Sequence, residues 1–255
     1  MSLSGNGMVY QGSKNRLAKF LVPIIQKYID DNNITTYIEP MVGGANLIDK
    51  IKCDKKIGAD INEELIALLK YAQSDNDLSI APDVCTFEHY ADVRKDRKLG
   101  THKYSKEYIA LIGYCASYGE RYFDGGFARN SRTDDRNSST IKYRNNLKNI
   151  RLQAHDLNDI EFRCCDYKDF ADYKNCLFYF DPPYRNTKQY SKQSIDYDEF
   201  YDFLRKLSEN NIVLISEYNM PDDFKCIWQK ERKVLQKSDR ITGEKAVEKL
   251  FKIRE

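Results

Sequence analysis

A short buried strand that ends in an acidic residue and two prolines is the stretch of this sequence best suited to chemistry. Residues 177–180 are an uncharged, largely aromatic run, and Asp181-Pro182-Pro183-Tyr184 follows directly. Proline donates no hydrogen bond to a sheet and pushes the residue before it towards extended geometry, so Asp181 lies at the carboxyl end of the strand. In open α/β sheets that edge binds ligands. The pattern predicts a carboxylate in a binding site with the Tyr184 ring beside it; an ordinary Pro-Pro turn is the alternative.

A glycine-rich turn follows the first predicted strand, residues 35–40, which ends in Glu39 and Pro40. The turn is Met41-Val42-Gly43-Gly44-Ala45, and we expect a helix from there through residue 51, with Ala45 in its first turn at negative φ. Strand, Gly-Gly turn and helix form the opening unit of a Rossmann-like sheet, in which glycine lets the backbone approach a ligand closely. The turn lacks the Gly-x-Gly-x-x-Gly pattern, which weakens an interpretation as a nicotinamide-dependent oxidoreductase.

Two further predicted strands also end in acidic residues. Strand 56–60 ends at Asp60, about 20 residues after the glycine turn, a spacing that suits a carboxylate accepting both hydroxyls of a ribose. Strand 160–167 ends in Asp166-Tyr167, a carboxylate and a ring that could bond the amino group of an adenine and stack on it. A helix or turn cap is an equally good interpretation of Asp166.

Near the start of the chain, Tyr10-Gln11-Gly12-Ser13-Lys14 precedes a helical pattern over residues 15–30. Glycine and serine before a helix can present backbone N–H groups to an anionic group. Taken alone the signal is weak, because a lysine at such a position is ordinarily a solvated surface residue.

The elements that must position these residues alternate along the chain. Strands are expected at 35–40, 56–60, 160–167, 177–180 and 212–218, and helices at 15–30, 62–73 (capped by Asn62) and 198–209. This alternation predicts an α/β fold with a Rossmann-like sheet. Residues 87–152 carry helical patterns without strong strand signals, including a buried helix at 108–116. We therefore expect a domain of residues 8–73 and 158–255, with residues 74–157 as a mainly helical insertion. A hairpin of strands 233–237 and 249–253 is expected at the end.

Positive charge gathers between residues 121 and 151, where eight Lys and Arg face three acidic residues. Interleaved with polar and aromatic side chains, this composition suits contact with DNA phosphates and bases; a solvated loop is the alternative. The candidates for DNA binding are Arg121, Arg129, Arg132, Arg136, Lys142 and Arg144. Residues 225–254 hold ten Lys and Arg against four acidic residues, an excess better explained by a solvated face than by DNA contact.

Composition narrows the class of protein. The 255 residues carry a net charge of only +2, which alone argues neither for nor against a nucleic-acid partner. No run of about 18 apolar residues is present, so no membrane span is expected, and there is no signal-peptide pattern. Seven cysteines without Cys-x-x-Cys spacing, accompanied by three histidines, indicate reduced thiols in a cytoplasmic protein and no metal site.

In this order the motifs resemble those of the Dam-like DNA adenine-specific (amino) methyltransferases, which depend on S-adenosylmethionine. The matching segments are Tyr10–Lys14, the Glu39–Ala45 loop, Asp60, Asp166-Tyr167 and Asp181–Tyr184. Met41 stands where the family has Phe, Ala45 where it has a third Gly, and Ser13 where a second Gly is frequent. The helical insertion also lacks the Asn-x-Pro-Tyr-Gly-like element associated with readers of GATC, so the recognition sequence stays open.

The resemblance implies a Rossmann-like methyltransferase sheet with helices on both faces and an inserted target-recognition domain. It implies that S-adenosyl-L-methionine is held by Tyr10, Lys14, Glu39, Pro40, Gly43, Gly44, Asp60, Asp166, Tyr167 and Asp181. Asp181 and the Pro182 carbonyl would accept the two amino hydrogens of a flipped adenine, and Tyr184 would stack on the base. No metal is implied. The expected partners are double-stranded DNA and a restriction endonuclease of the same system. The protein is expected to be a cytoplasmic monomer encoded by a bacterium or a phage.

Two other functions stay open at this stage. The four-residue motif at Asp181 does not distinguish the base, so a cytosine or an RNA target would fit the same chemistry. The chain could also be an inactive DNA-binding module that keeps the fold, although an intact Asp181 and Tyr184 speak against that interpretation.

Overall fold

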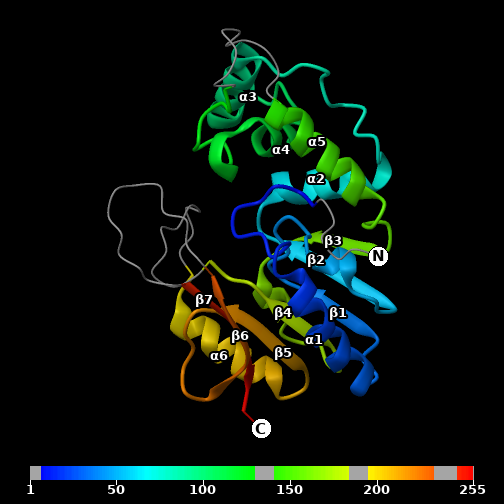
Figure 1. The fold of residues 1–255 in the computed structure, drawn as a ribbon, viewed down its shortest axis with the longest axis vertical. Coiled ribbons are helices and arrows are strands. Elements are labelled where there is room, and N and C mark those ends of the chain that lie inside the picture. The colour runs from blue at the N-terminus through cyan, green and yellow to red at the C-terminus, as the bar shows by residue number, and fades with distance from the viewer. Residues whose placement is uncertain (1–6, 130–140, 184–194, 233–245, 255) are drawn as a thin grey trace.

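The structure, a computed structural model, describes residues 7–129, 141–183, 195–232 and 246–254. Within these ranges seven strands form one sheet in the order β3-β2-β1-β4-β5-β7-β6 (Figure 1). The strands are β1 (Thr36–Glu39), β2 (Lys55–Asp60), β3 (Ile160–Cys164), β4 (Leu177–Phe180), β5 (Ile212–Glu217), β6 (Phe224–Arg232) and β7 (Ala246–Ile253). Strands β1 to β5 are parallel, whereas β7 is antiparallel to both of its neighbours. The predicted α/β fold with a Rossmann-like sheet is confirmed.

Helices cover both faces of the sheet. On one face lie α1 (Ala18–Asp31) and α2 (Glu63–Ser74), with α4 (Lys106–Ala116) and α5 (Ile141–Ala154) packed beyond α2. The other face is covered by α6 (Tyr197–Ser208). Side chains of a strand alternate between the two faces, and β4 shows this directly: Leu177 and Tyr179 join the first core cluster, Phe178 and Phe180 the second. Because both faces are covered, all four residues are buried and none is charged.

The strand order reverses between β1 and β4. These two strands are neighbours, but β2 follows on the far side of β1 and β5 on the far side of β4. In sheets of this kind, ligands bind in the crevice outside the carboxyl ends of the strands at the reversal point. Strand β1 ends at Glu39 and β4 ends one residue before Asp181. The topology therefore brings these two carboxyl groups to the place where a ligand site is expected.

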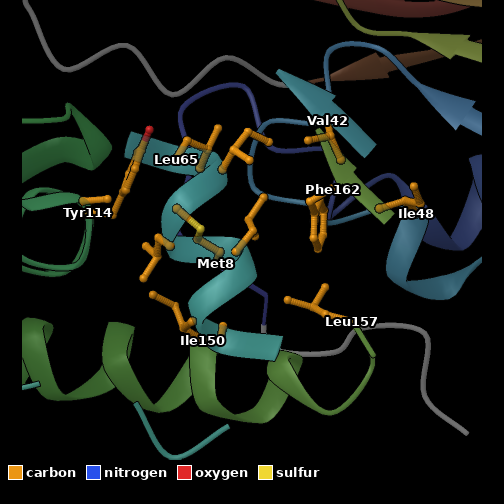
Figure 2. Packing of buried hydrophobic residues seen from close by; sticks show 14 of the residues in the cluster. Met8, Val42, Ile48, Leu65, Tyr114, Ile150, Leu157 and Phe162 are labelled. Carbon is orange, nitrogen blue, oxygen red and sulfur yellow. The ribbon is translucent and has the colours of Figure 1, made fainter. Parts of the chain in front are cut away.

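The helical region consists of α3 (Phe87–Leu99), α4 and α5, and it lies beside α2 (Figure 1). Figure 2 shows the junction with the sheet, where one cluster of buried side chains includes Met8, Leu65 of α2, Tyr114 of α4, Ile150 of α5 and Phe162 of β3. The sheet and the helical region thus share a hydrophobic core. The division at residues 74 and 157 stays a prediction.

The segment after the glycine turn differs from the sequence-based expectation. No α-helix follows; only a short 3₁₀ helix, η1 (Ile48–Lys50), is present. The expectation of a negative φ at Ala45 was wrong, since its φ is +54° and that of Gly43 is +49°. The Ala45 N–H donates to the Val42 carbonyl at 3.0 Å, which closes a tight turn. A backbone that is left-handed at two positions cannot continue into an α-helix. The left-handed conformation costs a residue with a Cβ about 1–2 kcal/mol.

Other boundaries shift by a few residues. The helix expected at 15–30 begins at Ala18, and β3 ends at Cys164, so that Tyr167 opens the 3₁₀ helix η3 (Tyr167–Phe170). The first strand of the terminal hairpin is β6, which the sequence analysis did not assign, while residues 233–237 lie outside the described ranges. Strand β6 is an edge strand, and its charged residues conceal the apolar alternation. In the part of the chain that the structure describes, no helix has the length and apolar character needed to cross a membrane.

Candidate active site

An open cleft of about 1960 Å³ lies at the carboxyl edge of the sheet. Its walls come from the ends of β1, β2 and β4, from the segment before α1, and from the helical region. Every described residue predicted to be catalytic or to hold the cofactor lines it: Tyr10, Lys14, Glu39, Pro40, Gly43, Gly44, Asp60, Asp166, Tyr167, Asp181 and Pro182. Tyr184 lies outside the described residues. Segments separated by up to 170 residues of sequence therefore meet in one cavity.

An ion pair between Lys14 and Asp181 occupies the crevice. The Lys14 Nζ lies 2.6 Å from Asp181 Oδ1, and the lysine side chain is buried. Burial raises the pKa of Asp181 above its ordinary value; the Lys14 ammonium opposes that rise, and the nearby Glu248 carboxylate adds to it. Glu248, on β7, is also buried and lines the cleft. The Lys14 ammonium thus favours the ionised form of Asp181 and works against the effect of burial.

Tyr10 lies against the glycine turn. A Cβ added to Gly43 would come within 2.8 Å of Cε1 of the Tyr10 ring, and one added to Gly44 would lie 2.9 Å from the Tyr10 Cβ. The neighbouring Asn46 fixes this arrangement, because its Nδ2 donates to the Met8 carbonyl at 2.9 Å. Glycine is therefore required at both positions by close packing, and at Gly43 also by the positive φ.

Asp60 is half-buried at the end of β2, and two backbone N–H groups hold its carboxylate. The Gly43 N–H donates to Oδ2 at 3.2 Å and the Asn62 N–H to Oδ1 at 2.9 Å. Burial raises the pKa of Asp60, and these two hydrogen bonds work against the rise. The Asn62 side chain caps α2 as predicted, accepting from the Leu65 N–H. The carboxylate is consequently fixed in orientation beside the glycine turn.

Glu39 has a different environment from the other two carboxyl groups. It is 3% exposed, and the Tyr37 hydroxyl donates to its Oε1 at 2.7 Å. Burial is the main reason why its pKa rises from 4.5 to about 8, with smaller upward contributions from Asp49 and Asp181. At neutral pH Glu39 is mostly protonated, so its side chain can donate a hydrogen bond as well as accept one.

Asp166 acts as a cap in this structure. Its side chain accepts a hydrogen bond from the Lys168 N–H. The Asp169 carboxylate in turn accepts one from the Asp166 N–H, which completes a capping box at the start of η3. Tyr167 is 8% exposed and its ring packs edge-on against Phe200 and Phe203. Both residues also line the cleft. Capping and ligand contact are compatible, because a cap uses only part of the hydrogen-bonding capacity of a carboxylate.

Of the described basic residues that were predicted to bind DNA, some line the cleft and others do not. Arg121 lines the cleft, whereas Arg129, Lys142 and Arg144 do not. Arg129 lies over the Phe87 ring at 4.9 Å, Lys142 over the Tyr118 ring at 5.6 Å, and Arg144 is exposed on α5. Arg132 and Arg136 lie outside the described residues.

The sequence analysis missed the basic side chains of α3. Arg94, Lys95, Arg97 and Lys98 all line the cleft. Four basic residues in a stretch of five were the available signal. The stretch lies before residue 121, where the basic excess was counted, and the acidic residues of the same helix conceal it in a sum of charges. No group of three or more His, Cys, Asp or Glu that could hold a metal ion occurs in the described ranges.

The sheet topology and the cleft at its carboxyl edge define a Rossmann-like α/β protein with its site at the reversal of strand order. The chain matches the D12 class N6 adenine-specific DNA methyltransferase family over residues 10–240, and it belongs to that family. It is therefore an adenine-specific DNA methyltransferase, and the resemblance drawn from the sequence motifs is confirmed.

Three relatives illustrate the similarity. The type II methyltransferase M.MjaIII of Methanocaldococcus jannaschii is 24% identical over 247 residues, which cover 83% of each chain. The DNA adenine methylase of Haemophilus influenzae is 27% identical over 172 residues, 62% of this chain and 58% of that protein. The modification methylase StsI of Streptococcus sanguinis is 25% identical over 196 residues, which are 70% of this chain but 28% of that protein.

Proposed function

We propose that this methyltransferase uses S-adenosyl-L-methionine to methylate the exocyclic amino group of an adenine flipped out of duplex DNA at a specific site. The observation that carries the proposal is the Lys14–Asp181 ion pair of 2.6 Å at the end of β4, in the same cleft as Asp60 and the glycine turn. A half-buried carboxylate inside a large cleft, with an ammonium beside it, suits the activation of a weak nitrogen nucleophile.

The residues of the crevice fit the proposed cofactor. Gly43 and Gly44 bring backbone to the crevice where a side chain would clash, and Asp60 presents a fixed carboxylate suited to the ribose hydroxyls. Lys14 supplies the positive charge that the methionine carboxylate needs, and Tyr10 forms the wall beside it. Glu39, Pro40, Asp166 and Tyr167 complete the proposed set. When bound, the cofactor supplies a methyl group on a sulfonium, which is a good leaving group.

Asp181 and Pro182 are proposed to make the adenine amino nitrogen reactive. That nitrogen is a poor nucleophile because its lone pair is conjugated into the ring. The Asp181 carboxylate and the Pro182 carbonyl can each accept one amino hydrogen, which turns the lone pair towards the methyl donor. The positive charge that develops on nitrogen is stabilised by these fixed acceptors. Tyr184 is proposed to stack on the extruded base. Lys14 contributes indirectly, because its ammonium lowers the pKa of Asp181 against the rise that burial causes.

The partners proposed are double-stranded DNA and a restriction endonuclease of the same system. Two relatives are named as a type II methyltransferase and a modification methylase, which supports the second partner. Residues 8–73 and 158–255 are proposed to hold the cofactor, and residues 74–157 to meet the DNA. A monomer in the cytoplasm is the proposed working state.

The test is a methyl-transfer assay with isotopically labelled S-adenosylmethionine and duplex DNA, followed by digestion to nucleosides. The expected product is N6-methyl-2′-deoxyadenosine at one sequence context, with loss of transfer in Asp181→Ala while DNA binding is retained. Asp54→Ala, which removes an exposed carboxylate before β2 at the opposite edge of the sheet, is the matched control and should keep full activity. Labelled cytosine, or equal activity of the Asp181→Ala variant, would contradict the proposal.

A further inference from the structure

The cleft has a second, basic wall on α3, which the chemistry proposed above does not use. Arg94, Lys95, Arg97 and Lys98 line this wall, while Asp181 and Lys14 line the same cavity at the carboxyl edge of the sheet. A substrate that places a base at Asp181 must carry its backbone across the cleft. A phosphate backbone is the part of DNA that basic side chains bind without regard to sequence.

The charges of α3 are separated between two faces of the helix. Asp92 and Asp96 are four residues apart and therefore share one face, which points to the loop before α4. Asp92 pairs with Lys103 and accepts from the Tyr104 hydroxyl at 2.7 Å, and Asp96 accepts from the backbone N–H groups of Lys103 and Tyr104 at 3.0 Å. Asp92 and Asp96 are thus occupied by hydrogen bonds and an ion pair to the loop, whereas the basic side chains of α3 line the cleft.

Packing holds α3 in a fixed position. The Thr86 side chain caps its first turn by accepting from the His89 N–H at 3.1 Å. Tyr90 is buried, its hydroxyl lies 3.1 Å from Ser117 Oγ, and its ring packs against Phe123 and Phe127. A helix fixed in this way presents its outward side chains at defined positions.

Arg97 differs from its basic neighbours on α3. Its Nε lies 3.0 and 2.7 Å from the two carboxylate oxygens of Glu64, and its guanidinium lies 4.8 Å from the Tyr122 ring centre. This contact joins α3 to α2, so Arg97 is occupied within the protein. Arg94, Lys95 and Lys98 are exposed, and no ion pair recorded among the described residues involves them.

We propose that Arg94, Lys95 and Lys98 form a phosphate-binding face for the duplex DNA substrate, next to the base-accepting end of the cleft. Arg94 and Lys98 are one helical turn apart, about 6 Å along the axis, and their long side chains can reach successive phosphates of one strand. The inference rests on the proposed function for the identity of the substrate. The main phosphate contacts were expected within residues 121–151, whereas this proposal places them on α3.

The experiment measures the affinity of the full chain for a duplex containing its target site between 50 and 300 mM NaCl. In the variant with Arg94→Ala, Lys95→Ala and Lys98→Ala, three lost contacts should reduce the slope of log K against log salt by about 2.7, at about 0.9 per phosphate. The control changes Lys52, Lys174 and Lys206 to Ala, which removes the same charge from exposed positions at the opposite edge of the sheet. Its slope should equal that of the parent protein.

Two further measurements separate this proposal from the proposed function. The α3 variant should keep the cofactor affinity of the parent, because these side chains are not among those proposed to hold the cofactor. A slope equal to that of the control overturns the proposal. A parent protein that transfers no methyl group, with the slope still reduced in the α3 variant, would support the DNA surface while refuting the proposed function.

Discussion

At the scale of single residues, the cleft depends on one buried carboxyl group, Glu39, and two half-buried ones, Asp60 and Asp181, that are each stabilised in a different way. Burial raises the pKa of Glu39, Asp60 and Asp181. Asp60 receives two backbone N–H groups, Asp181 receives an ammonium, and Glu39 receives one hydroxyl. The compensation is incomplete at Glu39, whose pKa still rises to about 8, and among the three only Asp181 is paired directly with an ammonium group. The residue that needs to be an anion for the proposed chemistry is thus the one with a cationic neighbour.

Removing the cationic neighbour tests this balance. In Lys14→Ala the pKa of Asp181 should rise further, because burial and the Glu248 carboxylate then act unopposed. The acidic limb of the pH–rate profile should therefore move to higher pH. Cofactor affinity should also fall by about 10-fold to 100-fold, the cost of one charge-assisted hydrogen bond. DNA affinity should change much less. Kinetics from pH 5 to 9 and calorimetric titration of the cofactor measure these effects.

Lys14→Arg is the control for this prediction, because it keeps the positive charge and should leave the acidic limb near its position in the parent protein. An acidic limb that does not move in Lys14→Ala would show that Asp181 needs no counter-ion. Equal losses of cofactor and DNA affinity would contradict the assignment of Lys14 to the cofactor.

Glu39 makes stability depend on pH in a defined direction. Its pKa is about 8 in the folded chain against an ordinary 4.5, so between these values the folded state binds more protons than the unfolded state. The free energy of unfolding should therefore fall as pH rises through this window, by up to about 1.4 kcal/mol per pH unit. Glu39→Gln keeps an acceptor for Tyr37 and should lack this decline. Urea unfolding at pH 5, 6, 7 and 8 measures the difference.

The matched control is Glu209→Gln, at an exposed position after α6. Its difference from the parent should stay constant over the same pH range. A constant difference for Glu39→Gln as well would mean that Glu39 ionises normally in the folded chain.

At the scale of elements, the sequence-based predictions of helices and strands were most accurate where a single local pattern dominates. Strand β4 lies at residues 177–180 as expected, since an uncharged run ended by Pro182 and Pro183 has few other interpretations. The N-cap at Asn62 was equally clear. Ala45 was misjudged because its left-handed φ belongs to a tight turn closed by its N–H to the Val42 carbonyl, and an alanine in a glycine turn does not by itself indicate that geometry. The α3 wall was missed because the segregation of its charges appears only when residues 92 to 98 are placed on a helix.

The glycine turn offers a test in which strain and contact can be separated. Gly43 and Gly100 both have positive φ, but a Cβ at Gly43 would clash with the Tyr10 ring, whereas one at Gly100 has no atom within 4 Å. Each Gly→Ala change should cost about 1–2 kcal/mol of stability through backbone strain. Only Gly43→Ala should also lower cofactor affinity, by about tenfold or more, because Tyr10 must move. Thermal unfolding and cofactor titration of both variants check this. Equal affinities of the two variants for the cofactor would show that Tyr10 is not part of the cofactor site.

At the scale of the whole molecule, the cleft lies between the sheet and the helical region, and side chains from both join beside it. The Tyr114 ring contacts the tilted Tyr10 ring at 5.8 Å between centroids and stacks on the Tyr122 ring at 4.4 Å, and the Tyr122 hydroxyl donates to Glu64 of α2 at 2.6 Å. The buried cluster of Figure 2 continues the same junction into the interior. The position of the helical region relative to Asp181 is therefore held by packed side chains as well as by chain connectivity.

A shared core predicts that the sheet and the helical region unfold together. Trp228 on β6, the single tryptophan of the chain, reports on the sheet, and far-ultraviolet circular dichroism reports mainly on the helices. Their urea transitions should coincide. Leu65→Ala, at the fully buried junction, should destabilise both by about 2–5 kcal/mol, whereas Leu99→Ala, at a position 61% exposed, should change both by no more than about 0.5 kcal/mol. A circular dichroism transition that shifts in Leu65→Ala while the Trp228 transition stays in place would instead establish residues 74–157 as a domain that folds independently.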